Sequence, residues 1–165
     1  MPGSQRGFTL IELIVVIILV GIISVTAASR FSGMSSISSP VYRDQLISSM
    51  RLTQMRAMQT RDNCHRWLLG NTKARQVDIS QATCNTSTFP GKATFWDDQT
   101  AIDVGNKLNA RFTITADGAP QTLPYALDFD SFGRIQKCSD GCRVTVSGSD
   151  TLAICIESEG YIHAC

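Results

Sequence analysis

The chain has 165 residues, which is enough for one compact domain with a buried core and a terminal segment outside it. Lysine and arginine number 15 and aspartate and glutamate 14, so the net charge of +1 offers no bulk attraction for nucleic acid or an anionic surface. The sequence has no HExxH, no GxSxG and no glycine-rich phosphate-binding loop. We therefore expect a protein that is not an enzyme and that has no cofactor.

A short polar segment, residues 1–7, precedes an apolar run at residues 8–28. A helix of this length spans about 30 Å at about 1.5 Å rise per residue, which is enough to cross a bilayer. Its one charged residue is Glu12, although a carboxylate in a spanning segment costs about 2.5–3.5 kcal/mol on insertion scales. We therefore predict a transmembrane helix over 8–28 in which Glu12 has a function.

The sequence GFTLIE at Gly7–Glu12 resembles the processing and assembly signature of type IV pilins and type II secretion pseudopilins. The resemblance implies that a prepilin peptidase removes residues 1–7 by cutting between Gly7 and Phe8, and methylates the new amino terminus at Phe8. That α-amino group has a reference pKa of about 8 and is mostly cationic at neutral pH. In the family, the carboxylate at the position of Glu12 pairs with this amine on a neighbouring subunit during assembly.

Residues 29–64 are expected to continue the helix beyond the membrane, with a loosened joint near 32–40. The segment 31–39 is rich in serine and glycine, and Pro40 fits only the first turn of a second helical segment, from Val41 to about Asp62. The apolar residues of that segment that we place on one helical face are Tyr42, Leu46, Ile47, Met50, Ala57 and Met58.

Residues 65–165 are predicted to form a β-rich head, because short alternating runs are separated by glycine turns. The predicted strands are Arg75–Ser80, Ala93–Trp96, Arg111–Ala116, Tyr125–Asp130, Arg143–Ser147, Thr151–Glu157 and Gly160–His163. An antiparallel sheet would bury its apolar face against Leu46, Met50 and Met58, with Trp67, Trp96 and Phe129 in the core. The fold class is therefore α+β, a ladle with a long helix as handle.

Two further segments resemble a narrower group. The stretch from Phe129 to Ile135 and the predicted hairpin from Ile154 to Ile162 resemble the GspH/FimT type of minor pseudopilin, and Tyr42–Met58 resembles the helix of a minor pilin of the mannose-sensitive haemagglutinin (MSHA) pilus. This implies a minor subunit that primes or joins a type IV pilus. The alternatives are a type II secretion pseudopilin and a DNA-binding minor pilin for DNA uptake.

The partners implied are other major and minor pilins, the prepilin peptidase, the inner-membrane assembly platform, and membrane lipid before assembly. Nucleic acid is a minority interpretation. Arg51, Arg56, Arg61 and Arg66 recur every five residues, so they spiral around a helix, and we expect them to be solvated or to bridge subunits.

All six cysteines follow the apolar run, which indicates disulfides formed in an oxidising space and a periplasmic carboxyl-terminal domain. Many pairings are open to six cysteines, but turns favour Cys138–Cys142 and Cys155–Cys165. That leaves Cys64, at the end of the helix, to pair with Cys84 across a loop of about twenty residues. Zinc at Cys64-His65 together with His163-Ala-Cys165 is the alternative. Disulfides account for every cysteine, so we predict no metal site.

Overall fold

The computed structural model describes residues 9–31, 38–60, 63–78, 83–95, 97–105 and 110–165. The chain divides into two units, Met1–Ser35 and Ser36–Cys165, and each is described by itself. The predicted leader (residues 1–7), Phe8, Arg61, Trp96 and most of the predicted joint near 32–40 lie outside the described residues.

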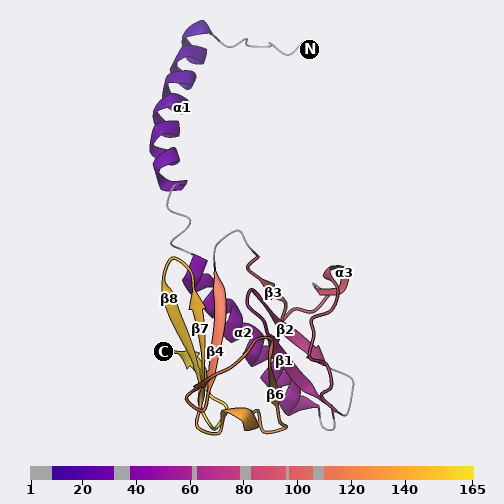
Figure 1. Cartoon of the computed structure of the whole chain (residues 1–165). Helices are drawn as coiled ribbons and strands as arrows, with labels where there is room; N and C mark the ends of the chain where they lie inside the picture. Colours follow the sequence, from indigo (N-terminus) through magenta and orange to yellow (C-terminus); the bar gives the residue numbers. More distant parts are fainter. Residues whose placement is uncertain (1–8, 32–37, 61–62, 79–82, 96, 106–109) are drawn as a thin grey trace, which may run out of the picture. The chain divides into compact units, whose positions relative to one another are not determined.

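The first unit contains helix α1, Leu10–Phe31 (Figure 1). Its side chains from Leu10 to Ser24 are exposed within the unit, and the apolar ones occupy every side of the helix. The hydroxyl of Ser24 donates to the carbonyl of Val20 at 2.7 Å, so this polar group is satisfied by its own helix. No helix among the described residues combines the length and the apolar character needed to cross a bilayer.

The second unit is built around helix α2, Ser38–Gln59. Pro40 is its third residue, as expected for a proline in a first helical turn. Leu46, Met50 and Ala57 are buried on one face. Met58, however, is 50% exposed, so its predicted place in the core is wrong: at 100° per residue it lies about 120° around the helix from Leu46.

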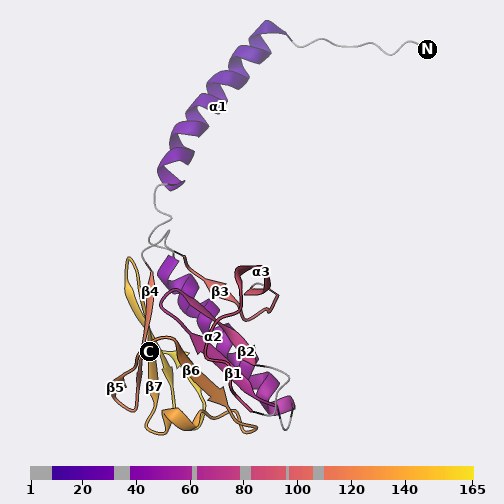
Figure 2. The same cartoon turned by 45° about the vertical axis from the view of Figure 1, so that its right-hand side comes forward.

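Among the described residues of the second unit, nine strands form two antiparallel sheets beside α2 (Figures 1 and 2). One sheet has the order β3-β2-β1-β6 and the other the order β5-β4-β7-β8-β9. The strands are β1 His65–Leu69, β2 Lys73–Asp78, β3 Ile102–Asp103, β4 Arg111–Ala116, β5 Ala119–Pro120, β6 Tyr125–Phe129, β7 Cys142–Ser147, β8 Thr151–Ile156 and β9 Ile162–Ala164. A short 3-10 helix, η1, covers Gln136–Cys138. The chain is therefore α+β with antiparallel sheets, as expected.

One predicted strand is wrong. Residues Lys92–Phe95 form the short helix α3, because the amides of Thr94 and Phe95 both donate to the carbonyl of Gly91 at 3.0 Å. That closure follows a Pro-Gly pair, which favours a turn over an extended strand.

The core lies between α2 and both sheets. Trp67 of β1 and Phe129 of β6 are buried, as predicted. The indole nitrogen of Trp67 donates to the hydroxyl of Ser49 at 2.8 Å, and that hydroxyl donates to the carbonyl of Thr100 at 2.7 Å. A large aromatic ring is thereby packed in the core with its one polar atom satisfied.

Candidate processing and assembly site

The predicted cleavage position, between Gly7 and Phe8, lies outside the described residues. Thr9 and Glu12, which follow it, are described, and together they build the amino-terminal end of α1. The amide of Leu13 donates to the carbonyl of Thr9 at 3.2 Å, which closes the first turn. Thr9 is therefore the N-cap of α1, and Glu12 is its third helical residue.

Thr9 and Glu12 form a capping box. The amide of Glu12 donates to the Thr9 hydroxyl oxygen at 3.3 Å, and the Thr9 amide donates to Glu12 Oε2 at 3.3 Å. The Thr9 hydroxyl also donates to Oε2, at 3.2 Å. Two helix-end amides that lack an intrahelical acceptor are satisfied in this way. Sequence reasoning missed this role, although T-x-x-E ahead of an apolar run is the recognised signal.

The carboxylate of Glu12 keeps one oxygen open. Oε2 accepts both bonds that Thr9 donates, whereas Oε1 accepts none from the part of the chain that the structure describes. An ionised carboxylate accepts at both oxygens, and a negative charge in a first turn is also favoured by the helix dipole. The side chain can therefore cap its own helix and still accept a bond from a second donor.

The three predicted cysteine pairs are the ones present in the structure. Cα–Cα distances are 5.2 Å for Cys64–Cys84, 5.1 Å for Cys138–Cys142 and 5.8 Å for Cys155–Cys165. The first disulfide joins the chain just after α2 to the segment before α3, and the third fixes the last residue beside β8. Turn positions in the sequence predicted the second and third pairs, and Cys64–Cys84 followed as the remaining pair.

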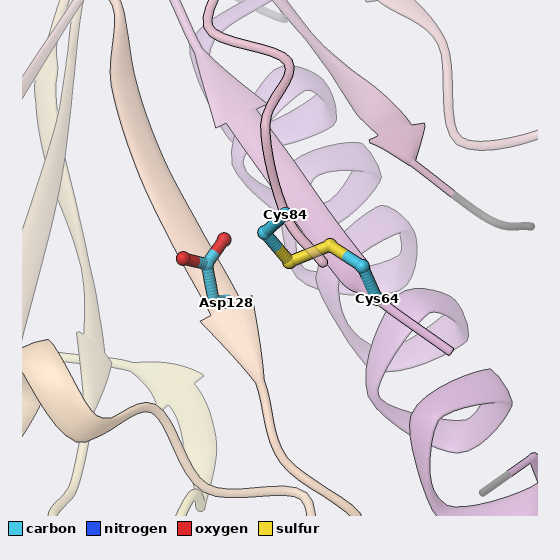
Figure 3. A group of neighbouring side chains, drawn as sticks. All are labelled: Cys64, Cys84 and Asp128. Carbon is cyan, nitrogen blue, oxygen red and sulfur yellow. A yellow bond between two sulfur atoms is a disulfide. The ribbon is translucent and has the colours of Figure 1, made fainter. Parts of the chain in front are cut away.

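Cys64, Cys84 and Asp128 lie close together, and their ligand-type atoms fall within 4.8 Å of one another (Figure 3). Both sulfurs belong to the disulfide, however, and a metal requires the deprotonated thiolate. The carboxylate of Asp128 accepts two bonds from Arg66, at 2.6 and 2.8 Å. In its disulfide form this group has no thiolate to offer a metal.

The two histidines considered as zinc ligands have protein partners at both ring nitrogens. His65 is buried and contacts Thr60 and Gln76, at 2.6 and 3.0 Å. His163 contacts Glu157 at 2.8 Å and the carbonyl of Ala164 at 3.0 Å.

The described arginines of the five-residue series also bond within the chain. Arg51 is exposed, as expected for a solvated group, whereas Arg66 lies in β1 and not on the helix, so the predicted spiral does not include it; a role between subunits stays a prediction. Arg51 donates to the carbonyl of Ile162 at 2.6 Å, and Arg66 pairs with Asp128. Arg56 donates to Gln76 at 2.7 Å and to Asp98 at 2.9 Å. The series therefore links α2 and β1 to both sheets and to the loop that holds Asp98.

Comparison with known proteins identifies the amino-terminal segment. Residues 3–28 match the family profile described as the prokaryotic N-terminal methylation motif, and the match includes Gly7, Phe8 and Glu12. No curated protein and no solved structure matches the chain. The chain carries the prepilin-type processing signal found in type IV pilin-like and pseudopilin precursors.

Proposed function

We propose that this chain is a minor pilin that is cleaved between Gly7 and Phe8 and then assembled into a type IV pilus of the MSHA kind. The observation that carries the proposal is the methylation motif over residues 3–28, which contains most of the apolar helix α1. The role is structural and not catalytic. Its finer resemblance is to the minor pilin MshC, through the α2 segment Tyr42–Met58.

The end of α1 suits the assembly step. Processing would create a cationic amine at Phe8, and Glu12 Oε1, which accepts no bond from residues that the structure describes, could accept one from another molecule. Pairing these charges would lower the cost of holding each one in apolar surroundings. The apolar side chains around α1 would be covered first by inner-membrane lipid and then by the helices of neighbouring subunits, with the second unit in the periplasm and then in the fibre or its tip.

The amino terminus of the mature protein tests the proposal. Mass spectrometry of the full chain purified from its host should show a methylated Phe8 as the first residue. An intact Met1, or a cut after the apolar run, would contradict the pilin assignment.

A second measurement separates the pilus from a type II secretion system, because both use the same processing signal. Deletion of the gene should abolish or shorten surface pili and leave secretion of folded enzymes intact. The opposite result would assign the chain to a secretion pseudopilin instead.

A further inference from the structure

Four of the exposed apolar side chains of the second unit lie on the carboxyl-terminal half of α2 or on two turns that contact it. Among its described residues, the large hydrophobic side chains that are exposed are Val41, Met55, Met58, Phe132 and Tyr161. Phe132 is 74% exposed and Tyr161 62%, whereas most other large apolar residues of the unit lie in the core. We define the Met–aromatic face as Met55, Met58, Phe132 and Tyr161.

Helix α2 holds the parts of this face together. Gln54 donates from one amide nitrogen to the carbonyls of Gly133 and Gly160, both at 2.7 Å. Gly133 directly follows Phe132 in the sequence, and Gly160 directly precedes Tyr161. The sulfur of Met58 lies beside Gly133. One turn away on the helix, Arg51 donates to the carbonyl of Ile162, next to Tyr161. Two loops from different sheets are therefore fixed against one stretch of helix.

The two loops also contact each other directly. A Cβ at position 160 would collide with the carbonyl oxygen of Gly133, and both glycines have positive φ values, 88° and 77°. Only glycine tolerates such a close approach in this conformation. The face is thus held rigid in advance, which lowers the entropy cost of docking.

The charges around the face are paired locally. Arg134 contacts Asp130 at 3.3 Å and lies over the ring of Phe132, 5.0 Å from its centroid. His163 contacts Glu157 at 2.8 Å and stacks on Tyr161 with 4.8 Å between ring centroids. Asp130 and Glu157 therefore offset Arg134 and His163 beside the two rings, so the face offers little attraction for a polyanion and suits an apolar protein surface.

The size of the face sets the kind of partner. Stable complexes between free proteins use about 20–30 residues a side, far more than these four. A small face is sufficient only when something else already holds the partner close, because tethering raises its effective concentration. Co-assembly through α1 would provide that tether.

We infer that the Met–aromatic face docks against the head of a neighbouring pilin-type subunit in the fibre, an inference that rests on the proposed function. It assigns to that contact a specific surface, formed by α2, the turn after β6 and the turn before β9.

Site-specific photo-crosslinking in the host tests the inference. The full-length chain would carry p-benzoylphenylalanine in place of Phe132 or Tyr161, with the same replacement at Val41 as the matched exposed control. We expect adducts from the first two positions to contain a protein with its own amino-terminal methylation motif, in several-fold higher yield than from Val41. Equal yields at Val41, adducts with proteins lacking that motif, or no adducts from a correctly processed chain would overturn the inference.

Substitution of the face gives a second, independent readout. The double variant Phe132→Ser, Tyr161→Ser should enter fibres about tenfold less than the wild type, which corresponds to about 1.4 kcal/mol, whereas Val41→Ser should enter normally. Peptide mapping of the three disulfides checks that the double variant has folded. Normal incorporation of the folded double variant would overturn the inference. A chain that is not cleaved before Phe8 would instead refute the proposed function, so the two failures are distinguishable.

Discussion

His65 is a neutral imidazole whose hydrogen-bond partners fix its tautomer. Arg56 donates to the amide oxygen of Gln76, so the amide nitrogen of Gln76 must donate to His65 Nδ1. The Thr60 hydroxyl donates to a helix carbonyl, so its oxygen accepts from His65 Nε2. No acceptor remains for a second proton at Nδ1. Burial, and next the charge of Arg56, lower the pKa of His65.

His163 has the opposite environment. Both of its ring nitrogens face acceptors, the carboxylate of Glu157 and the carbonyl of Ala164. The hydrogen bond to Glu157 is the main cause that raises the pKa of His163. The doubly protonated ring satisfies both acceptors, whereas the neutral ring satisfies only one.

The two histidines should therefore have opposite effects on stability as the pH changes. Below about 6.5 the unfolded chain protonates His65 and the folded chain resists it, so this site lowers the free energy of unfolding as the pH falls. His163 contributes stability below about 6.5 and loses it as the pH rises through its raised pKa.

Denaturant unfolding between about pH 5 and pH 8 would measure both contributions. His65→Gln should remove the decrease in the free energy of unfolding that His65 causes as the pH falls. Glu157→Gln should remove the stability that His163 contributes at low pH. An NMR titration in which His65 titrates above His163 would contradict the assignment.

Substitution can separate the capping role of Glu12 from its proposed role in charge pairing. Glutamine keeps the capping box but not the charge, whereas alanine removes both. If the charge pairs with a neighbour's amine, Glu12→Gln and Glu12→Ala should both leave membrane insertion intact or improved and should both lower incorporation into fibres. Quantitative immunoblotting of sheared fibres and membranes would measure this. Wild-type incorporation of Glu12→Gln would show that capping is the only function.

At the scale of elements, the success of sequence reasoning follows from one-sided burial. Strands β4 and β7 alternate between buried and exposed side chains, and the sequence predicts both of them. Strand β1 was missed because its residues are buried on both faces of the sheet, so they show no alternation of apolar and polar side chains. It is a central strand, paired with β2 on one edge and with β6 on the other. Met58 was misplaced because it lies at the edge of the buried face of α2, where the apolar pattern cannot distinguish core from surface.

The Cys64–Cys84 disulfide is expected to stabilise the folded chain more than the Cys138–Cys142 disulfide. It closes a separation of 20 residues, whereas Cys138–Cys142 closes a separation of 4. The loop-entropy model gives about 3 kcal/mol for the former and about 2 kcal/mol for the latter. Paired cysteine-to-serine variants, compared by denaturant unfolding, would measure the difference. A larger loss from the Cys138–Cys142 pair would contradict the loop-entropy account.

At the scale of the whole second unit, both sheets and α2 meet at Gly133 and Gly160. Gly160→Ala should destabilise the unit by more than Gly118→Ala. Both positions have positive φ, but a Cβ has open space at 118 and collides with backbone at 160. Strain alone costs about 1–2 kcal/mol at such a position, and the collision adds to it at 160. Thermal unfolding of the two variants gives the comparison, and equal losses would show that the contact between the loops is soft.

The disulfides also have a mechanical consequence. Tension on a fibre subunit would act on the second unit at its amino-terminal end, through α2. If the unit unfolded, the tension would stretch the unfolded residues. The residues between two linked cysteines cannot be extended. At about 3.3–3.6 Å per residue, the separation of 20 between Cys64 and Cys84 withholds about 70 Å of contour length. A head unfolded by force would therefore lengthen in limited steps, and all of β1 and β2 would stay within a covalent loop.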